Sequence, residues 1–190
     1  MNILVINNET KRIDELRILL QNHVIIELTP MHISQEVVAK SDLIVLTGSH
    51  KVSLAGHEAY FSKEIELIKS CPKPIIGICL GLQLIAYAYE GFIDRMPAKH
   101  HGVKDIKAVG HDPMFGERES FKVYASHRWM VERIDFPLIG LARSADGWEI
   151  VKHSCKKIYG FQFHPEVTEA GLHDGKNLFE KTLQNLYQKY

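Results

Sequence analysis

One cysteine of the sequence stands in a setting that favours nucleophilic chemistry. The segment Gly-Ile-Cys-Leu-Gly at positions 77–81 follows a short apolar run and precedes a run typical of a helix. Glycines on both sides of a nucleophile predict a sharp turn from strand to helix, because larger neighbours would clash there. The start of the helix favours a thiolate, and the N–H group of Leu80 would stabilise an oxyanion. Cys79 is the candidate nucleophile, although this motif alone also fits a small buried residue.

A histidine and a glutamate two residues apart close the last strand candidate. Pro165 favours an extended backbone at His164, and side chains two residues apart in extended backbone point to the same side. Glu166 would then hold one ring nitrogen of His164, and the other nitrogen would take the proton of the thiol. Alone, His164 fits an ordinary strand-end histidine. Together with Cys79 it predicts a Cys-His-Glu catalytic triad.

The elements that must position these residues alternate along the first half of the chain. Runs rich in Ile and Val predict buried strands at 3–6, 24–28, 43–46 and 75–78. Apolar residues at helical spacing predict helices near 13–20 and 60–68. Because strands and helices alternate, we expect an α/β fold with a parallel sheet covered on both faces.

The second half of the chain has a different pattern. Short strand candidates follow one another closely at 103–109, 121–125, 138–143, 148–152 and 158–163. This spacing is typical of antiparallel hairpins, with a turn at 154–157 and a closing helix at 177–187. No linker, repeat or low-complexity stretch interrupts the sequence, so we predict one domain over residues 1–190.

Composition and charge argue against several classes of protein. The 190 residues are 45% hydrophobic, which is enough for one compact core. Lys plus Arg and Asp plus Glu both number 23, so the net charge is zero and no basic field would gather nucleic acid. No apolar run approaches the roughly 20 residues that span a bilayer, and the sequence opens without a secretion signal. We therefore expect a cytoplasmic protein that binds neither nucleic acid nor a membrane.

The other cysteines and the paired histidines give no pattern of a metal site or of disulfides. Cys71, Cys79 and Cys155 include no CxxC pair, which fits neither a zinc site nor a disulfide framework. His100 and His101 are adjacent, and adjacent side chains on an extended segment diverge. We expect no metal site, and we expect Cys71 and Cys155 to take no part in the chemistry.

The two reactive segments together resemble a known family. Gly-Ile-Cys-Leu-Gly-Leu-Gln at 77–83 and Gln-Phe-His-Pro-Glu-Val at 162–167 look like the class I glutamine amidotransferases, over essentially the whole chain. Segments 141–144 and 159–167 are similar to the amidotransferase part of GMP synthetase. The glutaminase subunits of anthranilate and aminodeoxychorismate synthases are the next resemblance. The family implies a flavodoxin-like, doubly wound, mostly parallel sheet with an antiparallel hairpin extension in the second half.

The resemblance also implies roles for residues outside the triad. Gln83 would contact bound glutamine, and Ser126 and His127 would offer backbone groups to its α-carboxylate and amino ends. Without the resemblance, Gln83 fits a solvent-facing residue in the first turns of a helix. Ser126 and His127 would likewise fit an ordinary turn after a strand.

The loop after the third strand differs from the family pattern. The family has two glycines there, or Pro-Gly-Pro-Gly, and this loop supplies the second oxyanion donor beside Leu80. Gly48 matches and is assigned to both the oxyanion and the glutamine site, whereas Ser49 stands at the second position. A backbone donor tolerates a side chain, but we expect its conformation to be harder to reach at Ser49. Glu90 before Gly91 is a second departure, because the family commonly has a glycine pair there.

These residues predict hydrolysis of L-glutamine to glutamate and ammonia through a glutamyl thioester on Cys79. The resemblance implies that ammonia passes to a synthetase partner, with GMP formation from XMP as the first expectation. The sequence has no glycine-rich phosphate loop, so we expect no cofactor on this chain and Mg-ATP only on the partner. Three alternatives stay open: the glutaminase component of anthranilate or aminodeoxychorismate synthase, a free-standing γ-glutamyl hydrolase, and a catalytically silent regulatory module with an altered loop at 48–50.

Overall fold

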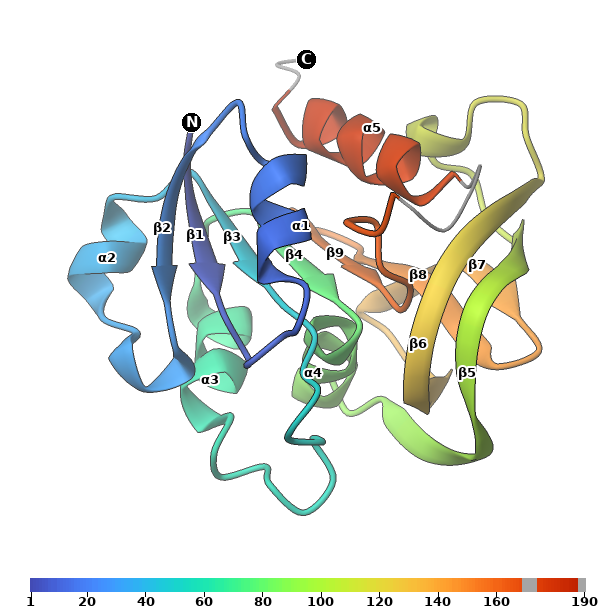
Figure 1. Cartoon of the computed structure of the whole chain (residues 1–190), viewed down its shortest axis with the longest axis horizontal. Coiled ribbons are helices and arrows are strands. Elements are labelled where there is room, and N and C mark those ends of the chain that lie inside the picture. Colours follow the sequence, from blue (N-terminus) through green and yellow to red (C-terminus); the bar gives the residue numbers. More distant parts are fainter. Residues whose placement is uncertain (169–173, 188–190) are drawn as a thin grey trace.

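The fold is one continuous sheet flanked by helices (Figure 1). In the computed structural model, which describes residues 1–168 and 174–187, nine strands are hydrogen-bonded in the order β2-β1-β3-β4-β9-β8-β6-β5-β7. The strands are β1 (Asn2–Ile6), β2 (Val24–Leu28), β3 (Leu43–Leu46), β4 (Ile75–Ile78), β5 (Phe92–Ala108), β6 (Ser120–Arg133), β7 (Leu138–Ser144), β8 (Gly147–His153) and β9 (Ile158–Phe161). The helices are α1 (Ile13–Leu19), α2 (Gln35–Ala39), α3 (Ser62–Ser70), α4 (Leu80–Ala88) and α5 (Gly175–Tyr187), with 3-10 turns η1 (Pro30–His32) and η2 (Pro113–Phe115). Among these described residues, no helix combines the length and apolarity that crossing a membrane requires.

The first half of the sheet is parallel and buried on both faces. β2, β1, β3, β4 and β9 pair in parallel with their neighbours. Side chains alternate along β1, so that Ile3 and Val5 join the core beneath α1 and α5, whereas Leu4 and Ile6 join the core beneath α3 and α4. Helices cover both faces, which explains why these strands are apolar throughout.

The second half of the sheet is antiparallel and larger than the predicted hairpin extension. Over the described residues, four strand pairs are parallel and five are antiparallel, so the sheet is not mostly parallel as predicted. The long strands β5 and β6 form a curved ribbon, green and yellow in Figure 1. Since β7 pairs with β5 and β8, and β8 also pairs with β6, these four strands close into a ring of pairings.

Predicted and observed elements agree best in the first half of the chain. Strands are found at the predicted bounds 24–28, 43–46 and 75–78. In the second half, the predicted strand 103–109 is the end of the 17-residue β5, and 121–125 is the first part of β6. The strand predicted to reach Phe163 stops at Phe161, and the short helix α2 was missed. The closing helix is confirmed, beginning at Gly175.

The end of α4 shows what the second departure from the family pattern does. Glu90 has a φ of 64°, in the left-handed region that favours glycine. The N–H group of Gly91 donates to the carbonyl of Ala86 over 2.8 Å, a bond typical of a helix that ends in a left-handed residue. Glu90 therefore makes the turn that a glycine would make, and the departure changes the residue type rather than the path of the chain.

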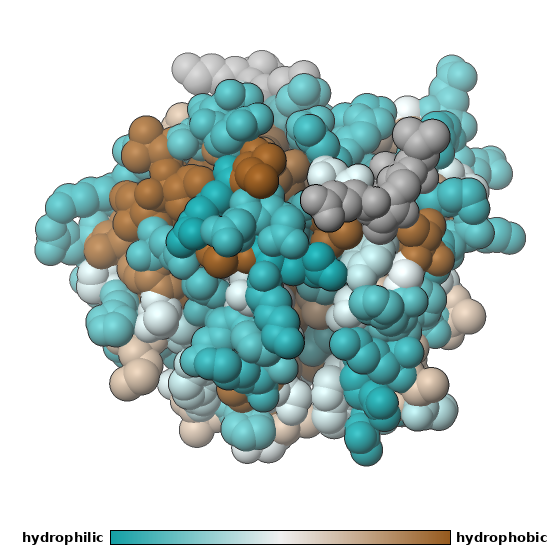
Figure 2. Space-filling view, viewed as in Figure 1, coloured by the Kyte–Doolittle hydropathy of each residue, from teal (hydrophilic) through white to brown (hydrophobic). Residues whose placement is uncertain are grey.

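The surface seen in Figure 1 is mainly hydrophilic, as Figure 2 shows. Apolar side chains gather at its left, over the edge of the sheet formed by β2. The exposed apolar residues of this part of the chain include Ile18 of α1 and Val24, the first residue of β2. This patch lies towards the amino ends of the parallel strands, away from the carboxyl ends where the reactive residues are found.

Candidate active site

The chain around Cys79 makes the sharp turn from strand to helix that the sequence predicts. Cys79 follows β4 and caps α4 with φ 53° and ψ −100°, a conformation that residues with side chains rarely adopt. A Cβ on Gly77 would lie 2.4 Å from the backbone of Gly81, and a Cβ on Gly81 would lie 2.4 Å from the carbonyl oxygen of Leu46. Both glycines are needed for β3, β4 and α4 to pack this closely. The turn places Cys79 at the carboxyl ends of the parallel strands.

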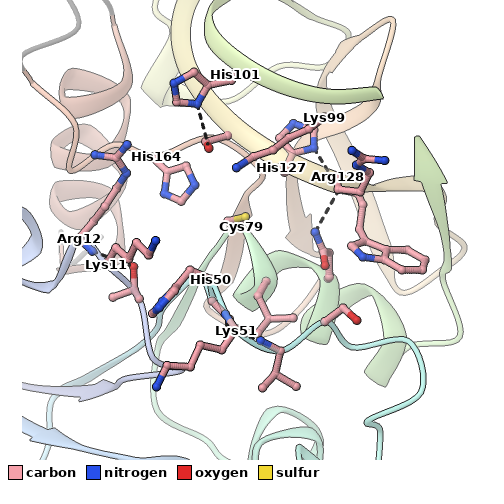
Figure 3. A pocket seen from close by; sticks show the side chains of 18 residues that line it. Lys11, Arg12, His50, Lys51, Cys79, Lys99, His101, His127, Arg128 and His164 are labelled. Atoms are coloured by element: carbon pink, nitrogen blue, oxygen red, sulfur yellow. Dashed lines mark hydrogen bonds between the residues drawn. The ribbon is translucent and has the colours of Figure 1, made fainter. Parts of the chain in front are cut away.

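His164 and Glu166 follow β9 and converge as predicted. Nδ1 of His164 lies 2.8 Å from Oε1 of Glu166, and both side chains are buried. The N–H group of His164 donates to the carbonyl of Tyr124 over 2.8 Å, which fixes the backbone at this point. The imidazole also shares a hydrogen bond with Cys79, near which it lies in Figure 3. The three residues form one connected group because β4 and β9 are neighbours in the sheet.

The electrostatics of this group favour a charged imidazole. Burial lowers the pKa of His164, but the charge of Glu166 and the hydrogen bond with Cys79 act against burial and raise it to about 10. An imidazolium between a carboxylate and a thiol stabilises the thiolate and holds a proton for a leaving group. The arrangement therefore suits attack by sulfur on a carboxamide or ester carbon.

The loop after β3 closes over Cys79 and His164. A Cβ on Gly48 would lie 3.3 Å from Cβ of Cys79 and 3.3 Å from Cε1 of His164, so little room is left for a side chain. Neither Gly48 nor Ser49 has a positive φ. Oγ of Ser49 accepts hydrogen bonds from the N–H groups two and three residues further along. The backbone difficulty expected at Ser49 is thus not found, because this side chain caps its own loop.

Gln83, Ser126 and His127 line the same cleft as Cys79. Gln83 is only 3% exposed and its Nε2 donates to the carbonyl of Trp129 over 3.1 Å, so it does not face solvent. Ser126 and His127 lie within β6 rather than in a turn.

The ring of His127 is neutral and has one free acceptor. Its Nδ1 donates to the carbonyl of Trp129 over 3.0 Å, and its Nε2 is buried without a partner among the described residues. Burial lowers the pKa of His127 to about 4, and the nearby charge of Lys104 acts in the same direction. A buried lone pair at the wall of a cleft suits a ligand that brings an N–H or O–H donor.

A cleft of about 610 Å³ opens at Cys79 (Figure 3). Its walls come from the loops after β1 and β3, the start of α4, and the strands β5 and β6. The charged residues of this lining that the structure describes are all cationic or histidine, and the cations are Lys11, Arg12, Lys51, Lys99 and Arg128. The cleft and its rim therefore favour anionic groups.

One polar neighbour of Cys79 was missed from the sequence. Nε2 of Gln162 donates to Sγ of Cys79 over 3.7 Å, and its Oε1 lies 3.5 Å from Nε2 of Gln83. Gln162 precedes His164 by two residues, so the spacing that linked His164 with Glu166 also pointed to Gln162. It connects the histidine segment with the nucleophile.

The remaining candidates lie outside this group. Cys71 packs in the core on the α3 and α4 face and Cys155 is exposed, and neither lines the cleft. Behind the cleft, His127, Asp146 and Glu149 place possible ligand atoms within 4.8 Å of one another. The ammonium group of Lys104 bonds both carboxylates, at 2.5 and 2.6 Å, and already supplies the cation there. The expectation of no metal site stays a prediction.

Comparisons with known proteins agree with this geometry. The chain matches the family model described as glutamine amidotransferase class-I over residues 5–185. It is 35% identical over 186 residues to the glutamine-hydrolysing subunit of the GMP synthase of Methanobrevibacter smithii, covering 95% of this chain and 93% of that protein. It is 32% identical over 161 residues to the protein of the same name from Saccharolobus solfataricus, covering 80% of this chain and 82% of that one.

Solved structures share the fold at lower sequence identity. A Thermoplasma acidophilum protein, described as a candidate subunit of GMP synthase, superposes with a TM-score of 0.85 at 20% identity over 98% of this chain and 94% of its own. A glutamine amidotransferase from Thermotoga maritima gives a TM-score of 0.72 at 20% identity, over 98% and 84% of the two chains. The match across nearly the whole sequence and the structural likeness lead to one conclusion: this chain belongs to the class-I glutamine amidotransferase family.

Proposed function

We propose that the chain is the glutaminase subunit of a two-subunit GMP synthase. It hydrolyses L-glutamine to glutamate and ammonia, and the ammonia passes to an ATP-dependent synthetase subunit that aminates XMP. The observation that carries the proposal is the connected group of Cys79, His164 and Glu166 beside the Gly48 loop. The choice of product rests on relatives named as the glutamine-hydrolysing subunit of GMP synthase, which align over most of their own length.

In the proposed reaction, Sγ of Cys79 attacks the side-chain amide carbon of glutamine. The C–N bond breaks, His164 gives its proton to the leaving nitrogen, and ammonia departs from a glutamyl thioester. Water then attacks the thioester, His164 takes a proton from that water, and glutamate leaves with its C–S bond broken. Glu166 keeps the ring oriented and stabilises its positive charge throughout.

The remaining site residues have supporting roles in this proposal. The N–H groups of Leu80 and of the Gly48 loop, including Ser49, bind the oxyanion, which suits a loop that lies against Cys79. Ser126 and His127 bind the α-carboxylate and amino ends of glutamine. The free Nε2 of His127 adds an acceptor for the amino end, and Gln83 closes the wall beside it.

The synthetase subunit is proposed to dock at the mouth of the cleft. Lys11, Lys99 and Arg128 stand there without an ion partner among residues 1–168 and 174–187. Unpaired cations around an opening attract an acidic surface, and docking there would let ammonia leave without meeting bulk water. We infer that the partner presents carboxylates around its own ammonia entrance.

We also infer that residues 1–190 act as a single domain without a cofactor of their own, and that Mg-ATP is bound by the partner. The order β2-β1-β3-β4-β9 with helices on both faces supports a flavodoxin-like, doubly wound arrangement for the parallel half. In such sheets ligands bind at the carboxyl ends of the strands, where the Cys79 cleft is found.

The proposal is tested by steady-state glutamate release from the purified chain. The rate is measured alone and with a separately encoded XMP-aminating subunit plus XMP and Mg-ATP, and GMP formation is followed in the same reactions. We expect a slow rate alone, and a steep rise together with GMP formation in the full mixture. A high rate that ignores the partner would indicate a free-standing hydrolase. Activation by an anthranilate or aminodeoxychorismate synthase subunit would change the product, and no release in any mixture would indicate a silent module.

A further inference from the structure

A buried carboxyl group lies one layer behind the candidate oxyanion loop. Glu64 on α3 is completely buried, although glutamate is seldom buried without a partner charge. Its Oε1 accepts a hydrogen bond of 3.0 Å from Nδ2 of Asn8, which follows β1. No cation bonds to Glu64 among the described residues. A charged carboxylate would therefore lie in the core without compensation.

Hydrogen bonds connect Glu64 with the Gly48 loop. The N–H group of Asn8 donates to Oγ1 of Thr47 over 2.9 Å, and Nδ2 of Asn8 donates to the carbonyl of Thr47 over 3.2 Å. Oγ1 of Thr47 in turn donates to the carbonyl of Gly48 over 2.9 Å. All four residues are buried, so the chain of bonds is shielded from water. It holds the loop from the side opposite to Cys79.

Two oxygen atoms of this network lack a donor. Oδ1 of Asn8 and Oε2 of Glu64 are both buried and without a partner. Both hydrogens of Nδ2 are used, one by each acceptor, so Asn8 has no donor left to give. A proton on Oε2 of Glu64 would give the pair the missing donor, and an acid and a carboxamide can then exchange two hydrogen bonds.

We propose that Glu64 acts as a neutral acid and is the positioning residue of the oxyanion loop, holding Gly48 against Cys79 and His164 through Asn8 and Thr47. The inference rests on the proposed glutaminase function and adds a residue to it. Glu64 touches no reacting atom. It acts by fixing the backbone donor before the reaction begins, when any displacement would weaken the oxyanion contact.

The electrostatic surroundings agree with a protonated side chain. Burial raises the pKa of Glu64 to about 8, and the hydrogen bond from Asn8 opposes this only in part. Along α3 the charged neighbours Lys63 and Glu66 are exposed. In the adjoining loops, Lys51 pairs with Glu9. The strands β1, β3 and β4 and the helix α4 carry no charged residue.

Kinetics of three variants between pH 6 and 9.5 test the proposal in the full complex. Glu64→Gln keeps a neutral side chain with an N–H donor, so we expect the wild-type kcat at pH 7 and no decline near pH 8. The wild type should decline there as Glu64 ionises. Glu64→Leu and Thr47→Val should lower kcat about 10- to 100-fold with little change in KM, because the oxyanion forms only after substrate binds.

Two matched variants separate positioning from general damage. Thr182→Val makes the same change at a completely buried threonine of α5, whose hydroxyl bonds within its own helix. Glu66→Gln makes the Glu64→Gln change at an exposed position of the same helix. Both should keep the wild-type kcat and pH profile. Wild-type kcat in Glu64→Leu, or equal losses in Glu64→Gln and Glu64→Leu at pH 7, would overturn the proposal.

Hydrogen exchange of the segment 47–53 gives a reading that does not require activity. At one fixed pH, Glu64→Leu and Thr47→Val should speed amide exchange there at least about 10-fold over the wild type, whereas Thr182→Val should not. If the wild type hydrolyses no glutamine but these shifts appear, the proposed function fails and the positioning by Glu64 stands. If exchange is unchanged in both variants, the loop is held by something else and the inference is wrong.

Discussion

Cys79 carries backbone strain that only its chemistry explains. Its φ of 53° and ψ of −100° cost on the order of 1–3 kcal/mol in a residue other than glycine. We therefore predict that Cys79→Gly and Cys79→Ala both abolish glutamate release, while Cys79→Gly is more stable than Cys79→Ala by about 1 kcal/mol. Denaturant unfolding of the two variants measures the difference. Equal stabilities would mean that the conformation at this turn costs little.

The same residue should be the only cysteine that reacts with an electrophilic glutamine analogue. Cys71→Ala and Cys155→Ala are matched controls, because one removes a buried thiol and the other an exposed one. Both should keep activity and labelling. Mass spectrometry that finds the label on Cys71 or Cys155 would contradict the site.

At the base, orientation and charge can be separated from the presence of the ring. His164→Ala should nearly abolish turnover, whereas Glu166→Gln should lose roughly 10- to 1000-fold, since the imidazole remains but loses its carboxylate. Glu166→Gln should also lower the pKa of His164, whose rise depends on that charge. Rates and their pH profile check both points. A wild-type rate in Glu166→Gln would leave Cys79 and His164 as a sufficient pair.

The site residues that the sequence predicted are those whose role is written in local spacing. Cys79 between two glycines and His164 two residues before Glu166 need no knowledge of the fold. Asn8 and Glu64 lie 56 residues apart and are ordinary polar residues in the sequence, so only their burial against each other shows a role. Tertiary contact of this kind leaves no periodic signal.

At the scale of elements, the close packing of β3, β4 and α4 depends on two glycines. Gly81→Ala would place a methyl group 2.4 Å from a carbonyl oxygen of β3, and we expect a loss of about 3 kcal/mol in the free energy of unfolding. Gly110→Ala is the control, because its new Cβ would meet nothing closer than 3.5 Å. Urea unfolding compares the two. A similar small loss in both would show that α4 can shift to make room.

Helix α3 carries a pH dependence through Glu64. Its pKa is raised on folding from 4.5 to about 8, so folding takes up a proton, and stability is lost as pH rises between these values. Glu64→Gln should lack this loss. Its stability relative to the wild type should increase by on the order of 3 kcal/mol between pH 4.5 and pH 7. Thermal unfolding across that range measures it, and a constant difference would mean that Glu64 is ionised in the folded protein.

Strands buried on both faces were readable from the sequence, and strands with an exposed face were not. β3 and β4 are unbroken apolar runs, so their bounds were predicted. β5 contains Pro97 and several charged residues, and its register with β6 shifts between Arg95 and His100. Its first half shows neither alternation nor an apolar run. Pairing with β6 overrides the local preferences of this segment.

For the whole molecule, zero net charge conceals an uneven distribution. Cations line the cleft mouth, so activation by the partner should weaken as salt rises. Lys99→Glu should reduce the ratio of partner-stimulated to unstimulated glutamate release about 10-fold. Lys107→Glu reverses an exposed lysine on the same strand outside the cleft, and it should leave that ratio unchanged. Equal ratios in both variants would place the docking surface elsewhere.

The position of β9 has a consequence for how the enzyme is made. β9 is the last strand in the sequence but lies inside the sheet, between β4 and β8. His164 leaves the ribosome 85 residues after Cys79, which takes roughly 4 to 17 seconds at ordinary rates of synthesis. During that interval the nucleophile has no base, so a nascent or truncated chain releases no ammonia. Such a chain also exposes the edges of β4 and β8, which marks it for aggregation or degradation.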